Sequence, residues 1–216
     1  MINLKLNNKR NSQTLRLLFL ILFLECVLTI LIVLFYINLI FGYFNFIENI
    51  SDYCFYLFFW VSILVLIINF ISVIYFIKWF RRAYYNTHLL HQNCRFEVER
   101  AMNSWFIPMY NLIVPYLIMK EMFEKNSRLL KITVKKTVFF LINAWWFLWL
   151  IAIFLKLNYY AFISSVNLDE EILGVLNREL LFHFIQIPLC ILTIFVLKKY
   201  SFIENELQHK FGLIYF

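Results

Sequence analysis

Four long apolar stretches restrict the fold of this chain more than any other feature of its sequence. They cover about residues 15–41, 53–80, 134–155 and 178–197. Each is long enough to cross a hydrocarbon core of about 30 Å as a helix that rises about 1.5 Å per residue. Because only helices and closed barrels satisfy their backbone polar groups in lipid, unbroken runs of this length indicate helices. The sequence therefore predicts an all-α membrane protein, a single membrane domain over residues 1–216 with four transmembrane helices in two hairpins.

Composition and charge agree with this class and exclude others. Hydrophobic residues make up 63% of the chain and charged residues 15%, whereas a soluble domain has about 45–50% and about 25%. A net charge of +7 would suggest nucleic acid in a soluble chain. In a membrane protein it indicates Lys and Arg gathered on the cytoplasmic side. We therefore expect the lipid bilayer as a partner and no nucleic acid. The abundance of Phe, Ile, Leu, Asn and Lys indicates an AT-rich, bacterial coding sequence.

The distribution of Lys and Arg predicts the orientation. Four lie in the N-terminal tail up to Arg16, eleven between Lys78 and Lys136, and three after the last stretch, whereas residues 42–52 contain none. The positive-inside rule places both termini and the central insert, residues 81–133, in the cytoplasm. The loop at 42–52 and the loop that carries Asp169, Glu170 and Glu171 then face outward. We expect a multi-pass protein of the bacterial inner membrane.

Four polar side chains interrupt the apolar stretches at a similar depth. Glu25, Asn69, Asn143 and Gln186 each lie seven to twelve residues from a basic flank, which corresponds to about 10–18 Å along a helix. They are expected to form one polar layer near the bilayer midplane. Glu25 would either bind a proton or cation, or stay uncharged and hydrogen-bond across helices as a structural contact. His183, in contrast, is expected to mark the outer interface.

The insert contains an apolar segment, residues 101–119, that is expected not to cross the membrane. Pro108 and Pro115 disfavour a helix at the residues that precede them. A fifth span would also carry the basic residues 120–136 to the opposite side. The segment is therefore predicted to be re-entrant or to lie on the surface, with its aromatic side chains at headgroup level. It is expected to follow a helix that continues the second span to Leu90, and to precede an amphipathic helix over 119–128.

Two side-chain sets in the insert suggest binding. Its arginines, among them Arg81 and Arg82, suit anionic lipid headgroups or an acidic partner protein. His88, His91 and Cys94 follow one another at i, i+3 and i+6, which is a spacing that could ligate a transition metal. These are three ligands without a fourth. We therefore expect no metal and no cofactor.

The insert and its flanks resemble the bacterial membrane family called domain of unknown function 4328. The resemblance covers about residues 75–149 and rests on the spacing of these side chains: Trp79, Arg81, Arg82, Ala83, Asn86, Trp105, Pro108, Asn111, Pro115, Tyr116, Glu121, Trp145 and Trp146. One departure is that a glycine expected soon after Asn86 is absent. The resemblance implies several spans around a basic loop, and no established activity, substrate or cofactor.

These motif residues suggest a structural hypothesis. Asn86 and Asn111 would donate hydrogen bonds to backbone carbonyls that the prolines leave unpaired. Arg81 or Arg82 would stack on Trp105 or pair with Glu121. The motif would then fold the insert against the ends of the spans, either as structure alone or as a gate or docking surface.

Two function classes follow. The first is a non-enzymatic binding, sensing or scaffold module that acts through the basic insert. The second is a small channel, transporter or pore-forming effector that uses the polar layer around Glu25. Because four helices enclose little space, a channel of this kind would be a homo-oligomer. An enzyme is not expected, since the sequence has no nucleophile and base at convincing spacing, no phosphate-binding glycine loop and no complete metal set.

Overall fold

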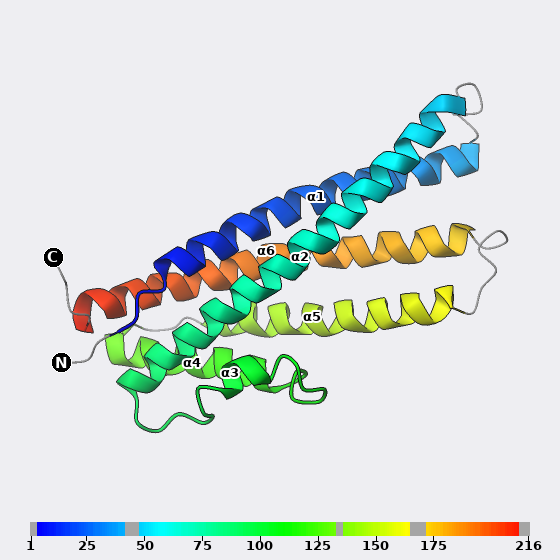
Figure 1. Cartoon of the computed structure of the whole chain (residues 1–216). Helices are drawn as coiled ribbons and strands as arrows, with labels where there is room; N and C mark the ends of the chain where they lie inside the picture. The colour runs from blue at the N-terminus through cyan, green and yellow to red at the C-terminus, as the bar shows by residue number, and fades with distance from the viewer. Residues whose placement is uncertain (1–3, 42–47, 133–135, 165–171, 212–216) are drawn as a thin grey trace. The chain divides into compact units, whose positions relative to one another are not determined.

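A computed structural model of the chain describes residues 4–41, 48–132, 136–164 and 172–211 (Figure 1). The regular structure of these residues is entirely helical. Residues 42–47 of the first predicted outer loop, residues 134 and 135 at the start of the third predicted span, and Asp169, Glu170 and Glu171 lie outside the described residues.

Four helices are long and apolar enough to cross a membrane: α1 (Asn8–Phe41), α2 (Glu48–Leu90), α5 (Lys136–Ile163) and α6 (Ile172–Phe211). They confirm the predicted all-α membrane class and its four spans. The 43 residues of α2 measure about 65 Å, which is more than a bilayer requires. The helix continues to Leu90, as predicted, and it begins at Glu48 rather than at residue 53.

The insert between α2 and α5 holds two shorter helices, α3 (Arg100–Asn103) and α4 (Val114–Leu130). The sequence placed the second of these at 119–128, so α4 begins five residues earlier than predicted. The physical reason is that Pro115 occupies the first turn, where a missing N–H removes no hydrogen bond and the fixed φ suits a helix. Lys131, with φ of 58°, ends α4 in the left-handed conformation.

The helices contribute to two compact units. One unit consists of Met1–Leu17, Ile71–Trp146 and Leu192–Phe216, and we call it the insert unit because it contains α3 and α4. The other consists of Leu18–Phe70 and Phe147–Ile191, and we call it the span unit. The first and last described residues of the chain both belong to the insert unit, as do all residues of the predicted insert.

The core of the insert unit is built on the end of α2. Trp79, Phe80, Ala83 and Tyr84 are fully buried there. The ring of Trp79 packs edge to face against Tyr200 of α6 at 5.8 Å between ring centroids. From α4, four fully buried side chains complete this core: Ile118, Met119, Met122 and Phe123. Large aromatic and aliphatic side chains of this kind contribute most of the packing energy of a unit this size.

A polar cluster lies within this core and joins three helices. The amide nitrogen of Asn126 on α4 donates a hydrogen bond to the hydroxyl of Thr87 on α2, at 2.9 Å. It donates another to the hydroxyl of Tyr200 on α6, at 2.7 Å. All three side chains are buried, so the amide nitrogen of Asn126 links α4 to both α2 and α6 inside the core.

Candidate functional site

Asn86, one of the motif residues, holds the N-terminal segment against α2. Its side-chain oxygen accepts a hydrogen bond from the backbone N–H of Lys5 at 3.0 Å, and its amide nitrogen donates to the carbonyl of Lys5 at 2.9 Å. One side chain therefore satisfies both backbone groups of Lys5. The hypothesis that Asn86 donates to a carbonyl freed by the prolines is wrong, because its amide donates to the carbonyl of Lys5, 81 residues away.

The same amide group takes part in a buried acidic contact. Asn86 and Asn7 both donate to the carboxylate of Glu204 on α6, at 3.2 Å in each case. Asn7 also donates to the carbonyl of Trp79 at 3.2 Å. Asn7, Asn86 and Glu204 are all buried. A carboxylate that is removed from water needs such donors, so this contact fixes the N-terminal segment, α2 and α6 together.

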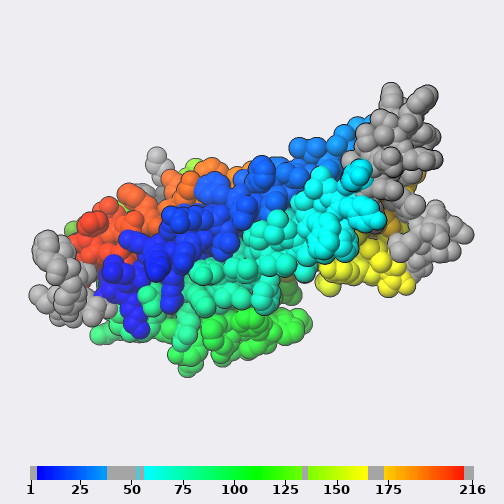
Figure 2. Space-filling model, turned by 45° about the horizontal axis from the view of Figure 1, so that its top comes forward, coloured from blue at the N-terminus to red at the C-terminus, as the bar shows by residue number. Residues whose placement is uncertain are grey.

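Two arginines extend this attachment. Arg82 donates to the carbonyl of Leu6 at 2.9 Å, and Arg10 donates to the carbonyl of Lys78 at 3.0 Å. Figure 2 shows the N-terminal residues, in dark blue, lying against the green-cyan end of α2 and the red end of α6. The N-terminal tail is therefore part of the insert unit.

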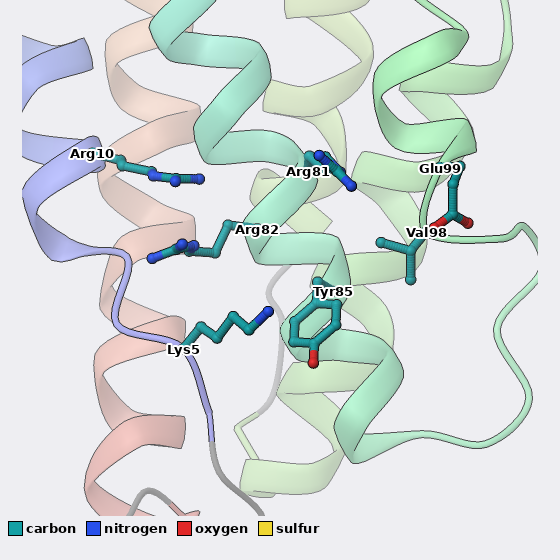
Figure 3. A pocket seen from close by; sticks show the side chains of 7 residues that line it. All are labelled: Lys5, Arg10, Arg81, Arg82, Tyr85, Val98 and Glu99. Atoms are coloured by element: carbon teal, nitrogen blue, oxygen red, sulfur yellow. The ribbon is translucent and has the colours of Figure 1, made fainter.

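A basic pocket is the consequence of this arrangement. Its cavity volume is about 290 Å³, and its lining comes from the N-terminal segment, α1, α2 and the segment before α3: Lys5, Arg10, Arg81, Arg82, Tyr85, Val98 and Glu99. Figure 3 shows Arg10 and Arg82 extending toward each other from α1 and α2, and Lys5 extending toward Tyr85. The Nζ atom of Lys5 lies 4.0 Å from the centre of the Tyr85 ring.

The charges around this pocket are unbalanced. Four of its lining residues are basic and one, Glu99, is acidic. Among the described residues, none of the four basic side chains takes part in a salt bridge, and Arg81 makes no hydrogen bond. Like charges that share a small volume repel one another. The pocket is therefore suited to an anion that accepts hydrogen bonds from several cations.

Glu121 pairs with groups other than the side chains of Arg81 and Arg82. Its carboxylate accepts a hydrogen bond from the hydroxyl of Tyr84 at 2.9 Å and one from the backbone N–H of Arg95 at 2.8 Å. It also forms a salt bridge with Lys125, one turn along α4, at 2.7 Å. The hypothesis that Arg81 or Arg82 pairs with Glu121 is therefore wrong, because nearer donors on α2, α4 and the connecting loop occupy its oxygens.

The motif tryptophans form an aromatic cluster instead of stacking on arginine. Trp105 packs edge to face against Phe76, Phe80 and Trp146, with ring centroids 5.5 to 6.3 Å apart. Trp145 donates to the hydroxyl of Thr193 on α6 at 3.0 Å. The stacking of Arg81 or Arg82 on Trp105 is thus a wrong prediction, because aromatic side chains surround that ring.

The other motif residues lie at the turn that leads into α4. Pro108 precedes Met109, whose φ is 66°. Among the described hydrogen bonds none runs from the amide nitrogen of Asn111 to a backbone carbonyl, so its predicted role as a donor receives no support, and its side-chain oxygen also has no partner there. Tyr116 instead donates to the side-chain oxygen of Asn143 at 2.8 Å.

The span unit contains a buried acid–base contact. The Nδ1 atom of His183 on α6 lies 2.6 Å from Oε2 of Glu25 on α1, and the two side chains are 6% and 1% exposed. The prediction that His183 marks the outer interface is therefore wrong. Glu25 therefore has a buried basic partner in His183, a pairing that was not predicted from the sequence.

Within the described residues of the span unit, the predicted polar layer is not assembled around Glu25. Asn143 belongs to the insert unit, where it is exposed and bound by Tyr116. Asn69 and Gln186 belong to the span unit, but among the described contacts neither is bonded to Glu25, and the side-chain oxygen of Gln186 has no partner. Equal depth along four helices does not bring four side chains to one face.

His88, His91 and Cys94 do not form a metal site. No group of three ligating side chains comes together within the described part of the chain. The Nε2 atom of His88 lies 2.8 Å from the carbonyl of Phe96, and the thiol of Cys94 faces the carbonyl of His91. Burial lowers the pKa of His91 and raises the pKa of the Cys94 thiol. A raised thiol pKa disfavours the thiolate that a metal requires.

Four apolar helices with a helical insert packed on part of them define an integral, multi-pass membrane protein. The family described as Domain of unknown function (DUF4328) matches residues 54–201, and the chain belongs to that family. This confirms the resemblance drawn from the tryptophan, proline and asparagine spacing. No curated protein and no solved structure matches the chain.

Several residues of the site carry no signal that predicts them from sequence. Lys5, Asn7, Arg10, Tyr85 and Glu204 were not candidates, although Lys5 and Arg10 were counted for orientation. The available signal was the dense run of basic and amide side chains before the first span. Its partners are up to 197 residues away, so no local pattern could identify them.

Proposed function

We propose that this protein is a non-enzymatic binding module of the membrane whose insert unit binds a phosphate-bearing anion in the basic pocket. The observation that carries this proposal is the convergence of Lys5, Arg10, Arg81 and Arg82 on one cavity, among whose described lining residues Glu99 is the one acid. Guanidinium groups present several donors in a fixed geometry that matches the oxygens of a phosphate.

The size and position of the pocket support a headgroup or a small phosphate ester over an acidic protein surface. A cavity of about 290 Å³ is near the lower limit of small-ligand sites, whereas a protein partner needs a broad surface. The pocket also lies just beyond Lys78, where the apolar part of α2 ends. Basic clusters next to a membrane helix attract anionic lipids.

The lining residues also support binding rather than catalysis. Serine, cysteine and histidine, which serve most often as nucleophile or base, are absent from the described residues that line the pocket. The contacts of the three arginines suggest a different part for each in binding the anion. Arg82 and Arg10 are held in place by the carbonyls of Leu6 and Lys78, and Arg81 is the side chain left available for the ligand.

Arg81→Gln is expected to weaken anion binding at least about tenfold, because one charge-assisted hydrogen bond contributes about 1.5–3 kcal/mol. Glu99→Gln is expected to strengthen it, since the acidic side chain opposes the anion. The probes are a short-chain phosphatidic acid, glycerol phosphate and inorganic phosphate, added to the full chain in neutral detergent, with the shift in melting temperature as the readout.

The control is Arg128→Gln, which removes an exposed arginine that pairs with Glu124 at 2.6 Å on α4 and does not line the pocket. This variant should bind as the wild type does. A shift by the lipid alone identifies a headgroup site, and an equal shift by glycerol phosphate identifies a soluble ligand. Equal affinities of the wild type and Arg81→Gln for every probe would contradict the proposal.

A second candidate function rests on a different observation, the buried contact between Glu25 and His183. Ionisable side chains inside a membrane often line ion or proton paths, so a channel or transporter that uses this contact stays a candidate. Its test is proton or cation flux into liposomes that contain the protein. Flux lost in Glu25→Gln but retained in Arg81→Gln is the expected result for a channel, and the absence of flux in the wild type excludes it.

A further inference from the structure

The loop between α3 and α4 exposes an apolar surface that a watery environment would not favour. Phe106, Met109 and Ile113 are 71%, 76% and 57% exposed, and Ile107, Tyr110 and Leu112 are exposed between them. We call residues 106–113 the apolar loop. Contiguous apolar surface of this kind marks contact with a partner or with a membrane.

The contacts of this loop place it beside the first turns of α5. Trp146 donates the hydrogen bond of its indole N–H to the carbonyl of Leu112 at 3.1 Å. Tyr116, just after the loop, bonds to Asn143 and stacks on Trp146 at 6.0 Å between ring centroids. In Figure 1 the loop between α3 and α4 runs beside the early part of α5.

These contacts set the depth of the loop. Asn143 and Trp146 lie seven and ten residues beyond Lys136, the first residue of α5, which is about 10–15 Å along the helix. Half of a hydrocarbon core is about 15 Å. The loop therefore lies beside the part of α5 that the leaflet surrounds, and Phe140 of α5, 74% exposed, belongs to the same side of the bilayer.

Most backbone N–H groups of the loop are paired within the protein, and those of Ile107 and Met109 have no backbone partner among the described hydrogen bonds. The N–H groups of residues 110 to 114 are all bonded within the loop, to carbonyls of residues 107 to 110. Pro108 has no N–H, and the carbonyl of Leu112 is bonded by Trp146. Irregular backbone is tolerated at membrane depth only where protein shields it, and these hydrogen bonds leave few polar groups of the loop that lipid would expose.

We infer that the apolar loop inserts into the leaflet in which α5 begins, with Phe106, Met109 and Ile113 against acyl chains. Arg100 marks the rim of the inserted part, because its guanidinium lies 5.1 Å from the centre of the Tyr110 ring and reaches the headgroups from there. The loop is thus a lipid anchor for α3 and α4, independent of any ligand in the basic pocket.

Spin labelling of the full chain in phosphatidylcholine vesicles tests this inference. A ketone-bearing phenylalanine analogue in place of Phe106 takes a ketone-reactive nitroxide and leaves the native cysteines unlabelled. The collision rates of the label with oxygen, which concentrates in lipid, and with a water-soluble nickel chelate are then compared. Their ratio is expected to be several-fold higher at position 106 than at position 97.

Two positions calibrate the measurement. Glu97 is exposed in the segment before α3, and Phe140 is exposed on α5. An oxygen-to-nickel ratio at position 106 that is closer to that of position 140 supports insertion, and one that is closer to that of position 97 overturns it. The same label at position 109 gives a second reading from the other side of Pro108, where a surface-lying loop would return the ratio of an aqueous site.

Discussion

Glu25→Ala is expected to lower the free energy of unfolding of the purified protein by about 3–5 kcal/mol, which is the usual cost of removing one partner from a buried ionic contact. The substitution leaves Nδ1 of His183 without its partner at 2.6 Å, in a place where His183 is only 6% exposed. His183→Ala should cost a similar amount. Reversible unfolding in mixed micelles, followed by helical circular dichroism, measures both losses.

Replacing both partners distinguishes a specific contact from general disturbance of α1 and α6. The double variant Glu25→Leu, His183→Leu should be more stable than either alanine variant, because an apolar pair leaves no buried polar group unpaired. Cys26→Ala, at an exposed neighbouring position, should change stability by less than about 0.5 kcal/mol. Additive losses for the two leucines would contradict the contact.

Asn86→Ala is expected to destabilise the insert unit by about 2–3 kcal/mol, since it leaves one buried and two partly buried groups without this partner, at about 1–3 kcal/mol for a fully buried group. The backbone of Lys5 loses both of its bonds, and the carboxylate of Glu204 loses one donor. Unfolding as above measures the loss. Trypsin should also cleave after Lys5 and Lys9 sooner than in the wild type.

Asn103→Ala is the matched control, because Asn103 is an exposed asparagine of α3. It should leave both the unfolding curve and the tryptic pattern unchanged. If trypsin cleaves Asn86→Ala no faster than Asn103→Ala, contacts other than the amide of residue 86 hold the N-terminal segment. The contribution of that segment to the basic pocket would then have to be reconsidered.

The spans could be predicted from sequence because each lies in a single unbroken apolar run, and lipid permits only a helix for such a run. The partner of Glu25 could not. Counting residues from a basic flank gives the height of a side chain along its helix, but it gives neither the face on which the side chain lies nor the helix that packs there. His183, 158 residues away, was for this reason assigned to the interface.

In the insert, proline rules gave the position of the irregular segment but not the start of α4. Pro115 disfavours a helix before it and favours one after it, and only the first effect entered the prediction. The prediction that the arginines suit an anionic headgroup or an acidic partner stays a prediction, whereas the pairing of Arg81 or Arg82 with Glu121 was wrong. The pocket depends on a tail that folds back onto α2, and such a contact leaves no periodic signal.

Thr87, Asn126 and Tyr200 have a consequence for how the insert unit finds its register. The apolar side chains around them, among them Met122 and Phe123, would tolerate a slip of α4 by one turn, because methionine adapts to many neighbours. The amide of Asn126 would not, since a shift of about 5.4 Å would take it beyond hydrogen-bonding distance of both hydroxyls, now 2.9 and 2.7 Å away. A single asparagine thereby selects one alignment of three helices from several that apolar packing would accept.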